Sequence, residues 1–151
     1  MSTNTSSGPP RCEFDADNLM LEVDLLVPSK IEAISPVVER LMRLLKKTCC
    51  ALEQGFAVET ALREALANAI VHGNRQDPRK KVRVCCACQA DGGILIIVKD
   101  EGQGFDPARL PSPLVGESIY SEHGRGIYLI NRLMDEVRFD GGGTEVHMRK
   151  G

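Results

Sequence analysis

The sequence lacks an excess of charge of either sign and lacks any long apolar run. Its 151 residues include 19 basic and 21 acidic side chains, for a net charge of −2. Proteins that bind nucleic acid or an anionic membrane surface usually carry a basic excess, which is missing here. No apolar stretch approaches the ~20 residues that span a bilayer. We therefore expect neither a nucleic acid partner nor a membrane attachment.

The first residues lack the charged start and apolar stretch of a signal peptide. They read MSTNTSSGPPR, a Ser-, Thr-, Gly- and Pro-rich composition typical of disorder. We expect residues 1–13 to form a disordered tail, residues 14–151 to form one domain, and the protein to be cytoplasmic. The chain is 42% apolar and 26% charged, which is typical of a soluble domain with one packed core.

The cysteines lack the paired C-x-x-C spacing of a zinc ribbon. There are six: Cys12, Cys49, Cys50, Cys85, Cys86 and Cys88. Without an export signal, disulfides are not expected. On a strand, Cys86 and Cys88 share one face and Cys85 takes the other. We interpret the cysteines as small buried apolar residues; the alternative is metal binding in a structural zinc protein, which metal analysis of the purified protein would test.

Apolar periodicity and turn residues predict an ordered series of elements. The predicted series is a strand at 19–27, a helix from about 31 to near 55, a helix at 56–72, strands at 80–90 and 93–100, a loop at 101–123, a helix at 126–137, and strands at 137–140 and 144–150. Ser29 and Glu32 match a capping box, and Pro36 either kinks the first helix or marks its true start. There are no internal repeats.

Most of the predicted strands are joined by short turns, such as the DGG at 91–93. The sheet should therefore be mixed or mostly antiparallel, with the helices packed on one face. This arrangement is a two-layer α/β sandwich. The loop of about twenty residues is unusual inside a compact domain, and loops of that length are usually functional.

The segment EALANAIVHGN, residues 64–74, carries Glu64 and Asn68 at one border of an apolar helix face. The two residues are four apart, so they lie one above the other. An amide oxygen is a ligand suited to Mg²⁺, and a neighbouring carboxylate can accept a proton from an attacking hydroxyl or water. Two solvated polar residues are the simpler explanation of this pair taken alone.

Three glycine-containing segments add further candidates. In KDEGQG, Asp100 ends an apolar strand before Gly102 and Gly104, where it can accept a hydrogen bond from an exocyclic amine. In GRG, Gly124 and Gly126 flank Arg125 at a helix start, where free backbone N–H groups favour an anion. Thr144 follows three glycines and has a hydroxyl to offer to a base. Taken singly, each segment is also explained as a turn, a helix entry or a hairpin.

Together, in this order and spacing, the segments resemble those of the GHKL (Bergerat-fold) ATPases, and within them the bacterial anti-sigma-factor serine kinases. EALANAIVHGN resembles the N box, DEGQGFDP and GRGIYLINRLMDEV resemble the two glycine boxes, and GGTEVHM resembles the last motif. The resemblance covers nearly the whole chain after about residue 14.

The resemblance implies a role for each of these residues. Glu64 is implied as the general base, Asn68 as the ligand of Mg²⁺ on the ATP phosphates, and Asp100 as the acceptor of the adenine amine. Residues 105–123 are implied as an ATP lid. The base pocket would be shaped by Gly102, Gly104 and Thr144, and the phosphates would lie against Gly124, Arg125 and Gly126. His72 and Asn74 also match, and we interpret His72 as structural, capping carbonyls at the helix end.

The resemblance also implies a function. Such proteins form homodimers in the bacterial cytoplasm, bind a sigma factor, and phosphorylate a serine or threonine of a STAS-type anti-sigma-factor antagonist. The expected activity is therefore that of an ATP-dependent serine/threonine kinase that acts as an anti-sigma factor.

Two alternatives use the same nucleotide-binding motifs. One is a catalytically inactive nucleotide-binding module that sequesters a sigma factor or another partner, against which the retained Glu64 argues. The other is the ATP-binding domain of a sensor histidine kinase. That domain works with a helix pair carrying a phosphoacceptor histidine, and no segment of this sequence matches one.

Overall fold

A computed structural model describes residues 8–14, 16–48, 55–106 and 122–151. Its α-helices are α1 (Ile34–Thr48), α2 (Gly55–Ala67) and α3 (Glu122–Leu133), with short 3-10 helices η1 (Ile31–Ala33) and η6 (Gly141–Gly143) and a π-helix η3 (Asn68–Gly73). Its strands are β1 (Leu19–Pro28), β2 (Lys81–Gln89), β3 (Ile94–Lys99), β4 (Glu136–Asp140) and β5 (Glu145–Lys150).

The described strands form one sheet in the order β1-β2-β3-β5-β4, and every neighbouring pair is antiparallel. The β2–β3 hairpin turns at residues 91–93, where Gly92 has a φ of +95° that favours glycine. The predicted mostly antiparallel sheet is therefore confirmed, and the strand pairs in the described part include no parallel one.

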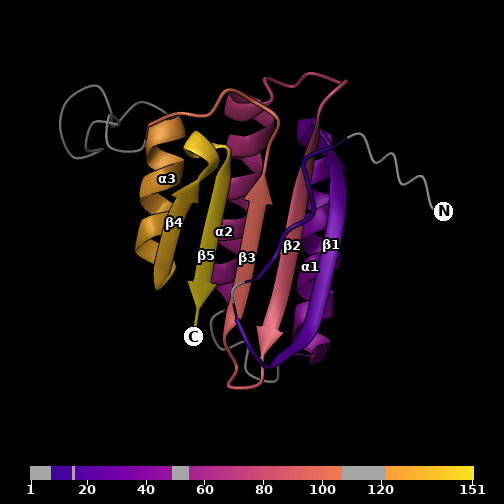
Figure 1. Ribbon diagram of the computed structural model, residues 1–151, viewed down its shortest axis with the longest axis vertical. Coiled ribbons are helices and arrows are strands. Elements are labelled where there is room, and N and C mark those ends of the chain that lie inside the picture. The colour runs from indigo at the N-terminus through magenta and orange to yellow at the C-terminus, as the bar shows by residue number, and fades with distance from the viewer. Residues whose placement is uncertain (1–7, 15, 49–54, 107–121) are drawn as a thin grey trace.

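All three α-helices cover one face of the sheet, as Figure 1 shows. The core lies between the layers and is built from apolar side chains at helical spacing on α1 and α2, such as Leu41, Leu45, Leu62 and Leu66. Alternate residues of β2, among them Val84, Cys86 and Cys88, meet them from the sheet. This confirms the two-layer α/β sandwich and the predicted division of the cysteines between the two faces of β2.

Several predicted boundaries differ from the structure. Pro36 lies in the first turn of α1, where a missing N–H is tolerated, and so marks the helix start. Ser29 is not the cap: Lys30 takes that position without a side-chain hydrogen bond, and Ser29 Oγ donates to Lys80 O at 2.6 Å. The α3 helix begins two residues before Gly124. The first helix was predicted to end near Gly55, but Gly55 is the first residue of α2; α1 is described to Thr48, and residues 49–54 lie outside the described part.

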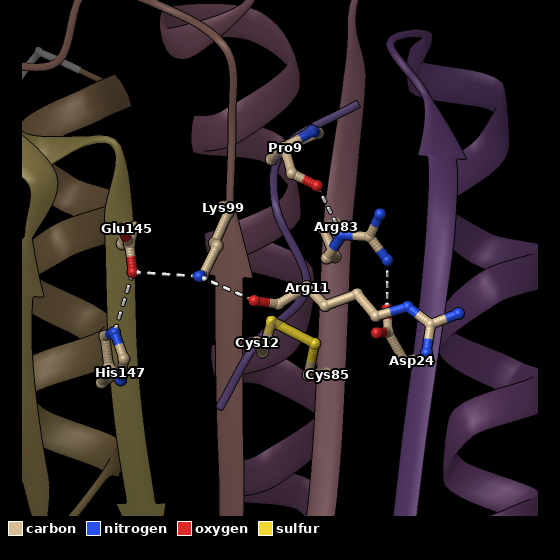
Figure 2. The surroundings of a disulfide bond; sticks show 9 residues. All are labelled: Pro9, Arg11, Cys12, Asp24, Arg83, Cys85, Lys99, Glu145 and His147. Atoms are coloured by element: carbon tan, nitrogen blue, oxygen red, sulfur yellow. Dashed lines mark hydrogen bonds and ion pairs between the residues drawn. A yellow bond between two sulfur atoms is a disulfide. The ribbon is translucent and has the colours of Figure 1, made fainter. Parts of the chain in front are cut away.

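The disordered tail predicted for residues 1–13 is wrong for residues 8–13. Residues 8–14, which we call the N-terminal strap, cross the face of the sheet opposite the helices (Figures 1 and 2). Arg83 Nε donates to Pro9 O at 2.7 Å, and Cys12 forms a disulfide with Cys85. The expectation of no disulfides is also wrong, because strand β2 brings Cys85 to the face that the strap crosses. Cys88 is disulfide-bonded too.

None of the helices in the described part is both long enough and apolar enough to cross a membrane.

Candidate functional site

A cavity of about 480 Å³ opens between the C-terminal half of the α2–η3 helix and the ends of β3 and β5. Its wall is largely apolar, with a few polar groups, which is typical of a small-molecule site. Among the predicted site residues, those that line it are Asn68, Asp100, Gly104 and Thr144.

A second cavity, of about 390 Å³, adjoins the first. The two share Asn68, Val71 and His72 in their walls. Glu64, Arg125 and Gly126 line the second cavity only. Most of the predicted residues thus divide between two adjoining spaces, with Asp100 lining one, Glu64 the other and Asn68 both, while Gly102 and Gly124 line neither.

The Glu64 and Asn68 side chains converge on Gly126 of α3. A methyl group placed on Gly126 would lie 2.9 Å from Glu64 Oε2 and 3.1 Å from Asn68 Oδ1. The glycine therefore lets α3 approach the α2–η3 helix without displacing the pair. Both polar side chains are half-buried. A carboxylate and an amide oxygen placed this way can accept a proton and ligate a hard cation.

Asp100 lies directly after β3 and faces the larger cavity. Its backbone N–H donates to Thr144 O at 2.9 Å, which fixes it to the start of β5. Burial raises the pKa of its carboxyl to about 6, against a smaller lowering by the Gly102 N–H, which donates to Oδ1 at 2.8 Å, and by the Lys80 charge. Its second oxygen, Oδ2, accepts no hydrogen bond from the described residues and is available to a donor in the cavity.

The glycines around Asp100 allow close backbone contacts that a Cβ atom at the same positions would block. A Cβ on Gly73 would collide with the Asp100 carboxylate, and a Cβ on Gly102 would collide with Gly73 O. Gly104 has a φ of +78°, and a Cβ there would collide with Gly142 O. The loop after β3 therefore packs directly on the end of η3 and on the turn before β5.

Thr144 lines the larger cavity, but its hydroxyl donates to Gly141 O at 2.9 Å within the η6 turn. The hydroxyl oxygen is left to accept a hydrogen bond. Gly124 is buried in the first turn of α3, and the exposed Arg125 follows it. Of the predicted lid, residues 105 and 106 are described without regular structure and residues 107–121 lie outside the described part.

His72 and Asn74 differ in their surroundings. His72 is exposed and lines both cavities. Asn74 is 1% exposed and fully engaged: its Nδ2 donates to Ser29 Oγ and Lys81 O, and its Oδ1 accepts from Glu101 N at 2.7 Å. Asn74 thus ties the helix end to the residue after β1, to the start of β2 and to the segment after β3.

The π-helical turn at Asn68–Gly73 was not predicted. In a π-helix the backbone bonds run from i to i+5, and such turns occur often at functional sites. Here the turn begins at Asn68, at the junction of the two cavities. The aromatic wall of the larger cavity was not predicted either; there Phe105 and Phe139 pack edge to face with centroids 5.4 Å apart.

Arg75 is a second missed residue of the larger cavity. It has a φ of +52°, which is uncommon outside glycine. Arg75 lies three residues after the predicted helix end, and its left-handed backbone is visible only in the structure, because the residue type gives no sign of it.

Asp140, Glu145 and His147 form a separate group with metal-ligating atoms within 4.8 Å of one another. These atoms already serve other partners. His147 Nε2 lies 3.2 Å from Glu145 and 3.3 Å from Asp140, while Arg138 binds Asp140 at 2.9 Å and Lys99 lies 3.5 Å from Glu145. We interpret the group as an ion-pair network.

Comparison with known proteins gives a consistent pattern. Residues 27–150 match the model of the histidine kinase-like ATPase domain. The chain is 33% identical to an anti-sigma F factor of Heyndrickxia coagulans over 61% of its own length and 66% of the relative's. It is 28% identical to the serine-protein kinase RsbW of Bacillus subtilis over 85% of its own length and 84% of the relative's.

The chain therefore spans slightly less than two thirds of the anti-sigma F factor that it matches. Among solved structures, the RsbU and RsbW domains of a Mycobacterium tuberculosis protein superpose with a TM-score of 0.60 at 19% identity. That match covers 87% of this chain and 32% of the other. At this identity the superposition speaks to the fold alone.

Proposed function

The chain belongs to the histidine kinase-like ATPase domain family, and from this premise we propose that it is an ATP-dependent serine/threonine protein kinase that acts as an anti-sigma factor. The observation that carries the proposal is the convergence of Glu64 and Asn68 on Gly126 in the second cavity, with Asn68 also lining the larger one. The names of the relatives support the same activity.

ATP is the phosphoryl donor in this proposal. Its adenine occupies the larger cavity, where Asp100 Oδ2 accepts a hydrogen bond from the exocyclic amine and the apolar wall of Phe105, Phe139 and Ile130 excludes water. Its phosphates extend past Asn68 into the second cavity, toward Arg125 and the first turn of α3. The positive end of that helix and the guanidinium favour the phosphate charge there.

The donor set fits a magnesium ion. Asn68 offers a neutral amide oxygen where the two cavities adjoin, and its side chain makes no hydrogen bond with the described residues. Mg²⁺ takes few protein ligands and shares its shell with water and phosphates. When bound, it neutralises charge on the phosphates.

Glu64 is proposed as the general base. Its carboxylate takes the proton of the acceptor hydroxyl as the hydroxyl oxygen bonds to the γ-phosphorus and the bond to the β-phosphate oxygen breaks. The products are ADP and a phosphorylated serine or threonine. Because Glu64 reaches the site from the helix that also carries Asn68, one rigid element positions both groups.

We propose as partners a sigma factor and a STAS-type antagonist, which is the phosphate acceptor. We further propose that the protein works as a homodimer in the bacterial cytoplasm. These proposals follow from the family pattern and from the relatives' names. Sedimentation of the purified protein, alone and mixed with candidate partners, tests the assembly.

The test of the function is the Glu64→Gln variant. It removes the proton acceptor at nearly constant size, so phosphoryl transfer from labelled Mg-ATP to STAS-domain proteins should fall by roughly 10²- to 10⁴-fold. Calorimetric titration should show ATP binding within about twofold of wild type, because the adenine contacts are untouched. Glu59→Gln, on the exposed part of the same helix where it pairs with Arg63, is the matched control and should transfer normally.

Unchanged transfer in Glu64→Gln would remove the assigned role. Saturable ATP binding that is lost in Asp100→Asn, without any transfer in the wild type, would favour the inactive nucleotide-binding module instead.

A further inference from the structure

The N-terminal strap covers part of the sheet face opposite the nucleotide cavities. Arg83 and Cys85 of β2 point to this face, yet they are only 4% and 1% exposed. Neither belongs to the core cluster between the sheet and the helices. They are buried because residues 8–14 lie across them, as Figure 2 shows around Pro9, Arg11 and Cys12.

Few contacts hold the strap in place. It has no helix or strand, and no backbone–backbone hydrogen bond joins it to the sheet in the described part. Within the described part, two of its carbonyls accept hydrogen bonds, Pro9 O from Arg83 Nε at 2.7 Å and Arg11 O from Lys99 Nζ at 3.4 Å. Pro9 is also buried, and Gly8 lies against the Leu26 side chain. Within the described part the only covalent attachment is the Cys12–Cys85 disulfide, which is therefore the strongest fastening of the strap.

The two sulfur atoms differ in access. Cys12 is partly exposed, whereas Cys85 is buried beneath it. An incoming thiolate therefore reaches the Cys12 sulfur, and Cys85 is the leaving group. Arg83 and Lys99, a cross-strand pair, lie two residues along the same face from Cys85 and Ile97. Their positive charges, partly balanced by Asp24 and Glu145, favour a departing thiolate.

The neighbouring thiol takes no part. Cys86 is free, fully buried and turned toward the helices. Burial raises the pKa of its thiol to about 12, so it stays protonated and unreactive. It provides a built-in control, because it lies next to Cys85 in sequence and on the opposite face of the same strand.

We propose that Cys12–Cys85 is a reversible thiol–disulfide latch, opened by a dithiol reductant, that fastens the N-terminal strap over Arg83. The inference that this disulfide is not permanent rests on the proposed function, because an ATP-using kinase works in a compartment whose thiol pool is reducing. Disulfides found there are usually transient and redox-sensing.

The exchange balances in two steps. A thiolate of the reductant attacks the Cys12 sulfur, forming a mixed disulfide and releasing Cys85 as a thiolate, which takes a proton. The second thiol of the reductant then attacks the reductant's first sulfur in the mixed disulfide. This closes the reductant's disulfide and releases Cys12 as a thiol. Two electrons and two protons pass from the reductant to the protein.

Opening the latch uncovers the outer face of β2. The Arg83 guanidinium, paired with Asp24 at 2.6 Å, loses its contact with Pro9 O and becomes accessible. The nucleotide cavities lie on the other side of the sheet, so their walls do not change. The latch thus controls a surface of the molecule and leaves the ATP site as it is.

The test compares oxidised and dithiothreitol-treated full-length protein under native conditions. Site-resolved alkylation with mass spectrometry should show Cys12 and Cys85 becoming reactive together, and closing again when the reductant is removed. Trypsin cleavage after Arg11 should accelerate by roughly tenfold or more on reduction, because proteolysis follows the population of the open segment.

Two variants separate this latch from the Cys88 disulfide, which dithiothreitol also reduces. Oxidised Cys12→Ser should be cleaved after Arg11 as fast as reduced wild type, although its Cys88 disulfide is intact. Cys86→Ala should behave like wild type in both states. A disulfide that opens only in denaturant, thiols that do not pair under mild oxidant, or equal cleavage in both redox states would each overturn the latch.

An ATP titration of the same samples keeps the two proposals apart. Loss of ATP binding counts against the proposed function alone, since the alkylation and proteolysis readouts do not depend on nucleotide.

Discussion

At the scale of single residues, the site depends on polar groups held at the border of the core. Asp100 shows the principle: burial raises the pKa of its carboxyl to about 6, while one backbone N–H and the Lys80 charge act in the opposite direction. Strongly shifted carboxyls in a cavity are frequent at functional sites. The proton on Asp100 therefore links pH both to folding and to nucleotide binding.

We predict that the stability contribution of Asp100 falls as the pH rises from about 4 to about 6. The native pKa is about 6, against the ordinary value of 3.8. Between these values the native state binds more protons than the unfolded state, so the free energy of unfolding decreases with pH and levels off above 6. Allowing for partial exposure, the loss is about 1 to 2 kcal/mol.

Urea unfolding of wild type and Asp100→Asn at pH 4, 5, 6 and 7 measures this loss, since the variant lacks the titrating group. Parallel profiles would contradict the prediction. ATP affinity should instead rise with pH and weaken below pH 6, where Asp100 is protonated. The ionised carboxylate is the stronger acceptor for the hydrogen bond from the adenine amine.

At the scale of elements, two joints position the site. The first is the approach of α3 to the α2–η3 helix at Gly126, where Glu64 and Asn68 converge. The second is the end of η3, where Asn74 bonds to Ser29 after β1, Lys81 of β2 and Glu101 after β3. Each joint depends on one residue: Gly126 through its lack of a side chain, and Asn74 through its three hydrogen bonds.

Gly126→Ala should reduce phosphoryl transfer without unfolding the protein. The added methyl would press on Glu64 Oε2 and Asn68 Oδ1, and misplacement of such groups costs up to about 10²-fold in rate. Alanine is a better helix former than glycine by about 1 kcal/mol, which offsets the crowding in stability. Thermal unfolding and transfer assays, with Arg132→Ala on the outer side of α3 as control, measure both effects.

Asn74→Ala should lower the free energy of unfolding by about 2 to 4 kcal/mol, because it leaves the Glu101 N–H, Ser29 and Lys81 O without their buried partner. Asn131→Ala is the matched control. Asn131 is an exposed residue whose side chain makes one part-buried hydrogen bond, to Ile127 O, and the loss of this bond should cost less than about 1 kcal/mol. Equal losses in chemical denaturation would argue against the joint.

At the scale of the whole molecule, the sheet separates two faces. The helices lie on one side and the strap lies on the other (Figure 1), and both candidate-site cavities are lined by residues of η3 and α3. Cys12 and Cys85 are 73 residues apart in sequence, so their disulfide closes a long loop across the sheet. The strap is thus coupled to the stability of the fold and is spatially apart from the chemistry.

Cys12→Ser should lower the free energy of unfolding by at most about 4 kcal/mol under oxidising conditions, since closing a loop of this length restricts the unfolded chain. The difference from wild type should nearly vanish in reducing buffer, where both proteins lack the bond. Denaturation in the two buffers makes the comparison. A difference that persists under reduction would point to lost packing at Cys12 instead of lost cross-linking.

The elements with strong periodicity were predicted well, because their side-chain patterns alone decide which face is buried. The strand at 19–27, the helix beginning at Phe56 and the hairpin at 91–93 are examples. The missed features depend on contacts between distant segments. Ser29 fits a local capping pattern but bonds to Lys80, 51 residues away. The tail composition indicated disorder, yet Cys85 fixes residues 8–13 to the sheet.

The sequence by itself determined the order of elements, the two-layer class and the residue types of the candidate site, since each follows from local spacing. Only the tertiary structure decided that Glu64 and Asn68 meet at Gly126, that the helix ends in a π turn at Asn68, and that the strap crosses Arg83. These features arise where backbones from separate elements come into contact. Such contacts depend on how whole elements pack together, which no local pattern encodes.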